Sequence, residues 1–137
     1  MATLNILYGN PTKFGEFPLN VVAGQTAVVG KLVSLKLSTE EWQLDNNAAA
    51  YAAGVLYSQD LDPYTGAANT LDKCVVLIGA GTIIETDQFV SAAAVVPGAE
   101  LEQGANGKWA IYAAGVKLGR VLAGGYGYAT VTIITYI

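Results

Sequence analysis

Two pairs of acidic residues have the spacing in this sequence that best suits catalysis. Glu85 and Asp87 stand two positions apart, and so do Glu100 and Glu102. In a β-strand this spacing places both carboxylates on one face, and two carboxylates that flank a glycosidic bond can hydrolyse it by acid–base chemistry. Solvated strand faces also carry such pairs without any catalytic role. We interpret both pairs as strand-face residues.

Two segments resemble ligand-binding loops but depart from them at deciding positions. Residues 75–81 resemble the strand and first glycines of a dinucleotide site, but Ile84 stands where the third glycine belongs. Residues 60–66 resemble the start of a calcium loop, but the glycine comes one place late and Leu71 occupies the position of the bidentate glutamate. We interpret the first segment as a turn between strands and the second as a surface turn.

The inventory of nucleophiles and metal ligands is short. The sequence has no histidine and one cysteine, Cys74. Imidazole-based triads, thiolate zinc sites and intrachain disulfides are therefore excluded. Cys74 begins an apolar run, which favours a buried, inert thiol. We predict no catalytic residue, no cofactor and no metal site, and expect that the protein is not an enzyme.

Charge is scarce in this chain of 137 residues, a length typical of one domain. Hydrophobic residues make up 53% and charged residues 13%, against about 25% charged in an ordinary soluble protein. The net charge is −4 and the seven basic residues are scattered, so we expect no nucleic-acid partner. Each apolar run is interrupted well before the roughly 18 residues of a membrane helix, so we expect no membrane span. No secretory signal is visible, and we expect synthesis in a cytoplasm.

The apolar pattern predicts an all-β protein, a small antiparallel β-barrel or sandwich of short strands. It is clearest in 129–137, where Val131 and Thr132 begin an alternation between two faces. The expected strands lie within 30–37, 55–57, 73–78, 98–103, 109–112, 119–122 and 129–137. Segments 38–41 and 48–54 could instead form short helical turns.

The chain also has signs of two pseudo-repeated halves. The pentapeptide YAAGV occurs at 51–55 and again at 112–116, but the shift that superposes these copies misaligns the other conspicuous residues. A better alignment pairs Gly30 with Gly98, Trp42 with Trp109 and Val55 with Val121. We interpret the pentapeptide as a coincidence of composition and the second alignment as a duplication, although chance among Ala, Gly and Val would also explain it.

These halves resemble a known family. The segments concerned are 30–35 followed by 53–56, and 98–101 followed by 119–122 and 129–133. They resemble bacteriophage head-decoration (capsid cement) proteins, which are small all-β barrels, and the similarity covers about residues 21–137. The resemblance implies a protein that binds the outside of an icosahedral shell, often as a homotrimer, and reinforces it without chemistry. The implied partners are the major capsid protein and other copies of this chain, and the implied location is the capsid exterior of the virion.

Residues 1–20 differ from the rest, and we expect an extended N-terminal arm followed by a decoration domain at 21–137. Glycines and prolines interrupt the arm, so no regular element is expected to run through it. Its large apolar side chains are too many for a solvated tail. The residues predicted to bind the capsid or a neighbouring subunit are Tyr8, Phe14, Phe17 and Pro18. The alternative is an arm folded back over its own barrel.

The shortage of charge and the eight tyrosines favour burial of the surface in a permanent assembly. We therefore predict a non-enzymatic virion structural protein that binds and stabilises an icosahedral phage capsid. The alternative is a tail- or fibre-associated β module that binds a receptor or a glycan.

Overall fold

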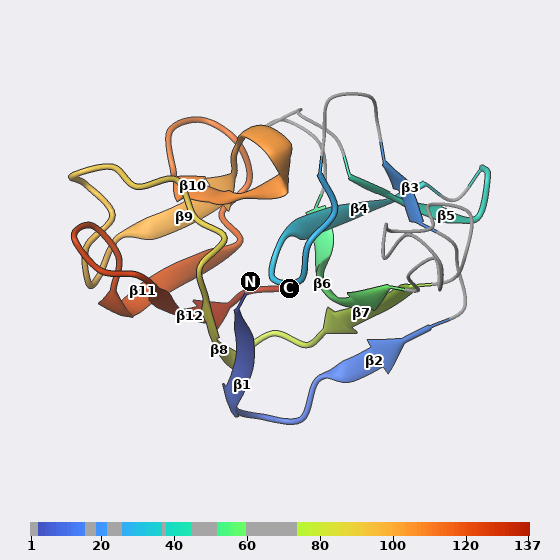
Figure 1. The fold of residues 1–137 in the computed structure, drawn as a ribbon, viewed down its shortest axis with the longest axis horizontal. Coiled ribbons are helices and arrows are strands. Elements are labelled where there is room, and N and C mark those ends of the chain that lie inside the picture. Colours follow the sequence, from blue (N-terminus) through green and yellow to red (C-terminus); the bar gives the residue numbers. More distant parts are fainter. Residues whose placement is uncertain (1–2, 16–18, 22–25, 37, 45–51, 60–73) are drawn as a thin grey trace, which may run out of the picture.

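A computed structural model describes residues 3–15, 19–21, 26–36, 38–44, 52–59 and 74–137 (Figure 1). Within these residues the protein is all-β, as predicted, with twelve strands and one short 3-10 helix at Ala105–Gly107. The strands are β1 (Leu4–Tyr8), β2 (Thr12–Phe14), β3 (Leu19–Val21), β4 (Leu32–Lys36), β5 (Glu41–Leu44), β6 (Ala52–Gln59), β7 (Cys74–Ile78), β8 (Ile83–Thr86), β9 (Glu100–Gln103), β10 (Trp109–Ile111), β11 (Gly119–Gly124) and β12 (Val131–Thr135).

The described strands form two open sheets of six, neither of which closes into a barrel. Sheet A has the order β1-β8-β12-β11-β9-β10, and sheet B has the order β2-β7-β6-β4-β5-β3. Most of sheet A lies on the left of Figure 1 and sheet B on the right. The named strands pair antiparallel except β3 and β5, which are parallel.

The N-terminal segment and the two possible helical turns can be compared with the structure. No single element runs through the described part of residues 1–20, which instead contributes short strands: β1 pairs with β8, β2 pairs with β7 and β3 begins at Leu19. Gly9 and Pro11 lie in the connection between β1 and β2, so they separate strands without interrupting one. The possible helical turns are also absent where the structure describes them, because 38–40 is a turn and Ala52 begins β6.

The predicted duplication is present in the sheet topology. Unit 1 (β2 to β7) and unit 2 (β8 to β12) repeat one order of neighbours: β2-β7-β6-β4-β5 corresponds to β8-β12-β11-β9-β10. The Gly30 amide donates to the Leu56 carbonyl and the Gly98 amide donates to the Val121 carbonyl, both at 2.8 Å. Both glycines have left-handed backbone angles, with φ of 94° and 93°, a conformation that favours glycine.

The tryptophan pair is also equivalent, whereas the valine pair is displaced by one residue. Trp42 pairs with the fourth residue of β4 and Trp109 with the fourth residue of β9, and both side chains are fully buried. The glycine hydrogen bonds make Val121 the equivalent of Leu56 and not of Val55. Shifting the alignment of two strands by one residue moves every side chain to the opposite face of the sheet. The sequence does not reveal this shift, because both halves have Val and Leu next to each other, at 55–56 and 121–122.

The second YAAGV copy has no equivalent role. Its residues 112–116 lie in the connection after β10, whereas the described part of the first copy, 52–55, belongs to β6. The interpretation of this repeat as a coincidence is therefore confirmed.

Strand alternation in sheet B serves two cores. Val33, Leu56 and Val76 are buried in the core of unit 1. Their neighbours Leu32, Val55 and Leu77 face the other way and pack into the core of unit 2. The junction also holds a buried hydrogen bond, from Trp109 Nε1 to the Gly30 carbonyl at 3.1 Å. The outer face of one sheet thus completes the core of the next unit.

Candidate interaction surface

The carboxylate pairs hold the scaffold together. Glu85 accepts a hydrogen bond from the side-chain Nδ2 of Asn5 at 3.0 Å, and Asp87 accepts one from the Thr3 backbone N–H at 2.9 Å, so both connect β1 with β8. Glu102 is buried and accepts from the Gly115 backbone at 2.6 Å. Its neighbour Glu100 forms an ion pair with Lys117 at 3.4 Å. Among the described residues no group of three or more Asp, Glu, His or Cys side chains could hold a metal ion.

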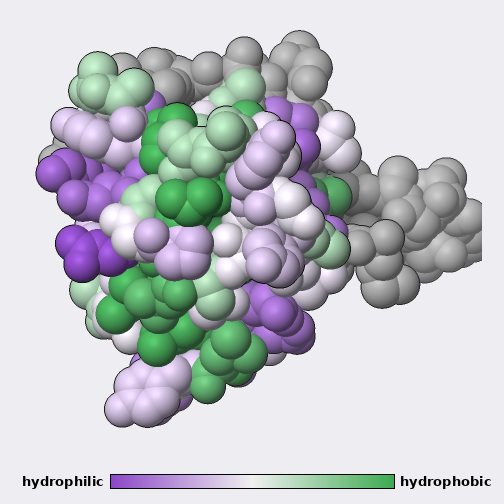
Figure 2. Space-filling view, turned by 90° about the vertical axis from the view of Figure 1, so that its left-hand side faces the viewer, coloured by the Kyte–Doolittle hydropathy of each residue, from purple (hydrophilic) through white to green (hydrophobic). Residues whose placement is uncertain are grey.

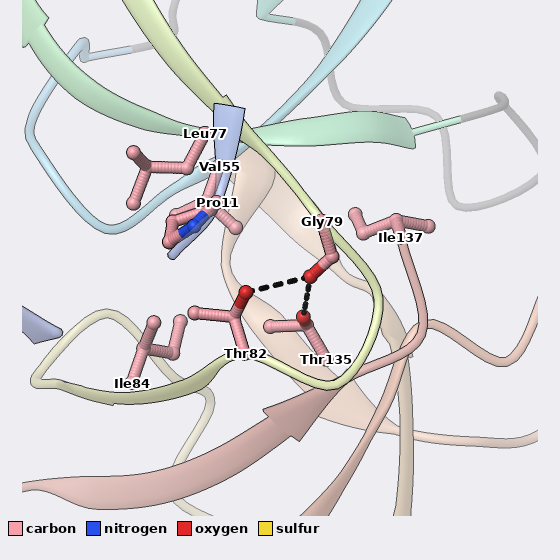
Figure 3. A pocket seen from close by; sticks show the side chains of 8 residues that line it. All are labelled: Pro11, Val55, Leu77, Gly79, Thr82, Ile84, Thr135 and Ile137. Atoms are coloured by element: carbon pink, nitrogen blue, oxygen red, sulfur yellow. Dashed lines mark hydrogen bonds between the residues drawn. The ribbon is translucent and has the colours of Figure 1, made fainter. Parts of the chain in front are cut away.

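A small hollow lies at the junction of the two units (Figure 3). It has room for about one water molecule and is lined mainly by apolar side chains. The Thr82 and Thr135 hydroxyls point to the same acceptor and donate to the Gly79 carbonyl at 2.7 and 3.0 Å. These bonds satisfy the polar groups of the hollow and tie the turn after β7 to β12. In the described part of the chain, no helix is long and apolar enough to span a membrane.

Two buried ionisable groups have altered acidity. Burial, together with the smaller effect of the charge of Lys108, lowers the pKa of Lys31 to about 8. Its side chain is 2% exposed and donates to the Thr26 carbonyl. Burial raises the pKa of the Cys74 thiol to about 11, so the thiol is protonated at neutral pH and a weak nucleophile.

The two described residues among those predicted to bind a partner, Tyr8 and Phe14, lie in different sheets. Tyr8 ends β1 at the margin of sheet A and is 71% exposed. Phe14 belongs to β2 in sheet B, where it packs edge-to-face on Trp42 with ring centroids 5.9 Å apart. Phe14 therefore contributes to its own chain's core, which is the folded-back alternative for this part of the arm. Phe17 and Pro18 lie outside the described residues.

A surface that the sequence interpretation missed lies over the connections before β9 and between β11 and β12. Its most exposed large side chains are Tyr128 (70%), Tyr126 (54%), Val96 (45%) and Leu122 (42%). No Asp, Glu, Lys or Arg occurs in 89–99 or in 121–137. Figure 2 views this side of the molecule, where hydrophobic side chains gather along the middle and strongly hydrophilic ones lie toward the flanks. We call Val96, Leu122, Tyr126 and Tyr128 the tyrosine face.

The backbone holds these tyrosines in place. Gly124, Gly125 and Gly127 have φ of 71°, 97° and 84°, which only glycine adopts readily. The Tyr126 amide donates to the Val95 carbonyl at 2.8 Å, which ties the two connections together. A side chain at Gly125 would place its Cβ 2.3 Å from the same carbonyl oxygen. The segment GGYGY therefore combines a tight backbone with two outward aromatic rings, and it is the signal by which the sequence could have located this surface.

Fold and surface define the class of the molecule as an all-β protein of two tandem units, with exposed tyrosines on a segment that carries no charged residue. No protein-family model matches the chain, and no curated protein matches it.

Proposed function

We propose that this protein is a non-enzymatic structural component of a phage virion that binds the outside of an icosahedral capsid and stabilises it. The single observation that carries the proposal is the tyrosine face. Exposed apolar and aromatic side chains on segments that carry no charged residue are typical of protein contacts, where charged residues are depleted and tyrosine is enriched. The partner would be the major capsid protein.

The rigidity of the tyrosine face supports tight binding. Tyrosine loses little conformational entropy when it is immobilised, because it has two side-chain torsions. The glycine-shaped backbone already holds Tyr126 and Tyr128 outward, so ordering of this segment costs little on binding. Burying each ring contributes about 1.5 to 3 kcal/mol. A ligand that binds only the closed shell stabilises that state, and many copies act together.

The binding test uses the full chain and undecorated capsids from the particles that carry it. Tyr126→Ser with Tyr128→Ser should weaken binding by at least about 100-fold, since the two rings together contribute about 3 kcal/mol or more and each 1.4 kcal/mol corresponds to a tenfold change. Tyr112→Ser is the matched control, because Tyr112 is exposed on another connection. Unchanged capsid binding by the double variant would overturn the proposal.

Cryo-electron microscopy of the virion distinguishes the two assembly sites. We expect many copies on heads, including heads without tails. A few copies confined to tails or fibres would refute the capsid assignment and support the receptor- or glycan-binding alternative.

A further inference from the structure

Because the two units are equivalent, a row of side chains across the outer face of sheet A has an equivalent row across the outer face of sheet B. In sheet A, strand register aligns Tyr8, Ile83, Ile134 and Arg120 across β1, β8, β12 and β11. In sheet B, register aligns Lys13, Leu77, Val55 and Leu32 across β2, β7, β6 and β4. Equivalent strands give equivalent positions, so Ile83 corresponds to Lys13, Ile134 to Leu77 and Arg120 to Val55.

The two rows have different surroundings. In sheet B, Leu32, Val55 and Leu77 are at most 3% exposed because they pack into the core of unit 2. In sheet A, Ile83 and Ile134 are only half-buried, although they are large and apolar. The exposed side chains Tyr8 and Tyr136 extend the apolar area beside them, since Tyr136 follows Ile134 by two residues along the chain.

We propose that this area, defined by Tyr8, Ile83, Ile134 and Tyr136 and called the outer row, is a docking surface for a unit of the same fold supplied by a second copy of the chain. The equivalent face of unit 1 already carries such a unit within the chain. By this equivalence, the occupant that we assign to the outer face of sheet A is a neighbouring unit. The proposal does not depend on capsid binding, because it uses a different surface from the tyrosine face.

Charged side chains beside the outer row limit the area of the apolar contact. Arg120 replaces the buried Val55 of unit 1, and Glu100, which pairs with Arg120 in the sheet, replaces Leu32. Glu85 borders the row on β8 and is hydrogen-bonded to Asn5. The apolar contact therefore covers β1, β8 and β12 and ends at a charged border, which makes it smaller than the contact within the chain. Such a contact forms reversibly and depends on protein concentration.

The experiment is sedimentation velocity of the full chain from about 1 µM to about 1 mM, the range of weak protein contacts. The wild-type protein should associate as concentration rises. The variant Ile83→Thr with Ile134→Thr keeps β-forming residues at both positions and should raise the dissociation constant at least about 30-fold, an effect in the range of two interface side chains. Val90→Thr is the matched control, because Val90 is exposed and belongs neither to the outer row nor to the tyrosine face, and it should associate like the wild type.

Each outcome is decisive. A wild-type protein that stays monomeric over this range overturns the proposal, and so does an outer-row variant that associates normally. Should the double threonine variant fail to fold, Tyr8→Ser replaces it, because Tyr8 ends a strand and is mostly exposed, and its dissociation constant must then rise at least about fivefold. The tyrosine-face variant should still self-associate, so failure of capsid binding and failure of self-association are separate results.

Discussion

Two glycines at equivalent positions make the duplication testable by stability. Gly54 in β6 pairs with Val33, and Gly119 in β11 pairs with Leu101, at the same place in each unit. A Cβ at Gly54 would lie 2.3 Å from Val76 Cγ1 and 2.8 Å from the Leu77 carbonyl oxygen. A Cβ at Gly119 would lie 2.7 Å from Ile133 Cγ2 and 2.9 Å from the Ile134 carbonyl oxygen. The neighbouring strand therefore leaves no space for a methyl group at either position.

The expected cost follows from these contacts. Overpacking of a close-packed core lowers the free energy of unfolding by about 1 to 3 kcal/mol. Replacing glycine by alanine raises it by about 0.4 to 1 kcal/mol, because alanine reduces the conformational entropy of the unfolded chain. Gly54→Ala and Gly119→Ala should each lower the free energy of unfolding by about 1 to 2 kcal/mol, with the larger loss at the tighter Gly54 site. The melting temperature should fall by about 4 °C per kcal/mol in a chain of this size.

The assay is urea unfolding of the full chain followed by tryptophan fluorescence, since both tryptophans are fully buried. Gly15→Ala is the control, because a Cβ there would meet only Val75 Cγ2 at an ordinary 3.6 Å, and it should be as stable as the wild type or slightly more stable. Wild-type stability in both Gly54→Ala and Gly119→Ala would refute the packing argument. A loss at only one site would refute the equivalence of the units.

Three further predictions concern buried polar groups. Trp109→Phe should destabilise the protein by about 1 kcal/mol more than Trp42→Phe in chemical denaturation, because Trp109 Nε1 bonds the Gly30 carbonyl whereas Trp42 Nε1 has no partner among the described residues; equal losses would contradict this. The pKa of Lys31 falls from 10.5 to about 8 on folding, so the unfolded chain binds more protons between these values and stability should rise with pH across that window. The midpoint of urea unfolding of Lys31→Met should therefore rise less with pH over this window than the midpoint of the wild type. Identical pH profiles of the two proteins would refute a contribution of Lys31. The raised pKa of the buried Cys74 thiol predicts that a thiol reagent at about pH 8 labels it only as fast as the protein unfolds, and rapid labelling of the native protein would show the thiol to be accessible.

Much of the fold could be predicted because its signals are local. Alternation of apolar residues located seven of the strands, including β4, β7 and β12, since a half-buried strand repeats every two residues. Gly30 and Gly98, which share one backbone conformation, and the buried Trp42 and Trp109 revealed the duplication. Glycine and tryptophan are easy to recognise by residue type, so the two halves could be aligned although the spacing between these residues differs slightly between them.

The short strands could not be predicted with the same certainty. β2 has only three residues and β8 only four, and neither was among the expected strands. Their strand state depends on partners far along the chain, β7 for β2 and both β1 and β12 for β8. Phe14 illustrates the consequence, because an apparent anchor of a free arm packs on Trp42 once β2 joins the sheet.

The amino-acid sequence by itself determined the strand class, the two-unit plan and the scarcity of charge. Tertiary structure decided which apolar side chains were left at the surface. Tyr8 and Ile83 are 75 positions apart in the chain and become neighbours only through the register of β1 with β8, and Tyr126 is positioned by a hydrogen bond to Val95 in another connection. Periodicity assigns a residue to a face of its own strand, but whether that face is covered depends on the packing of distant strands.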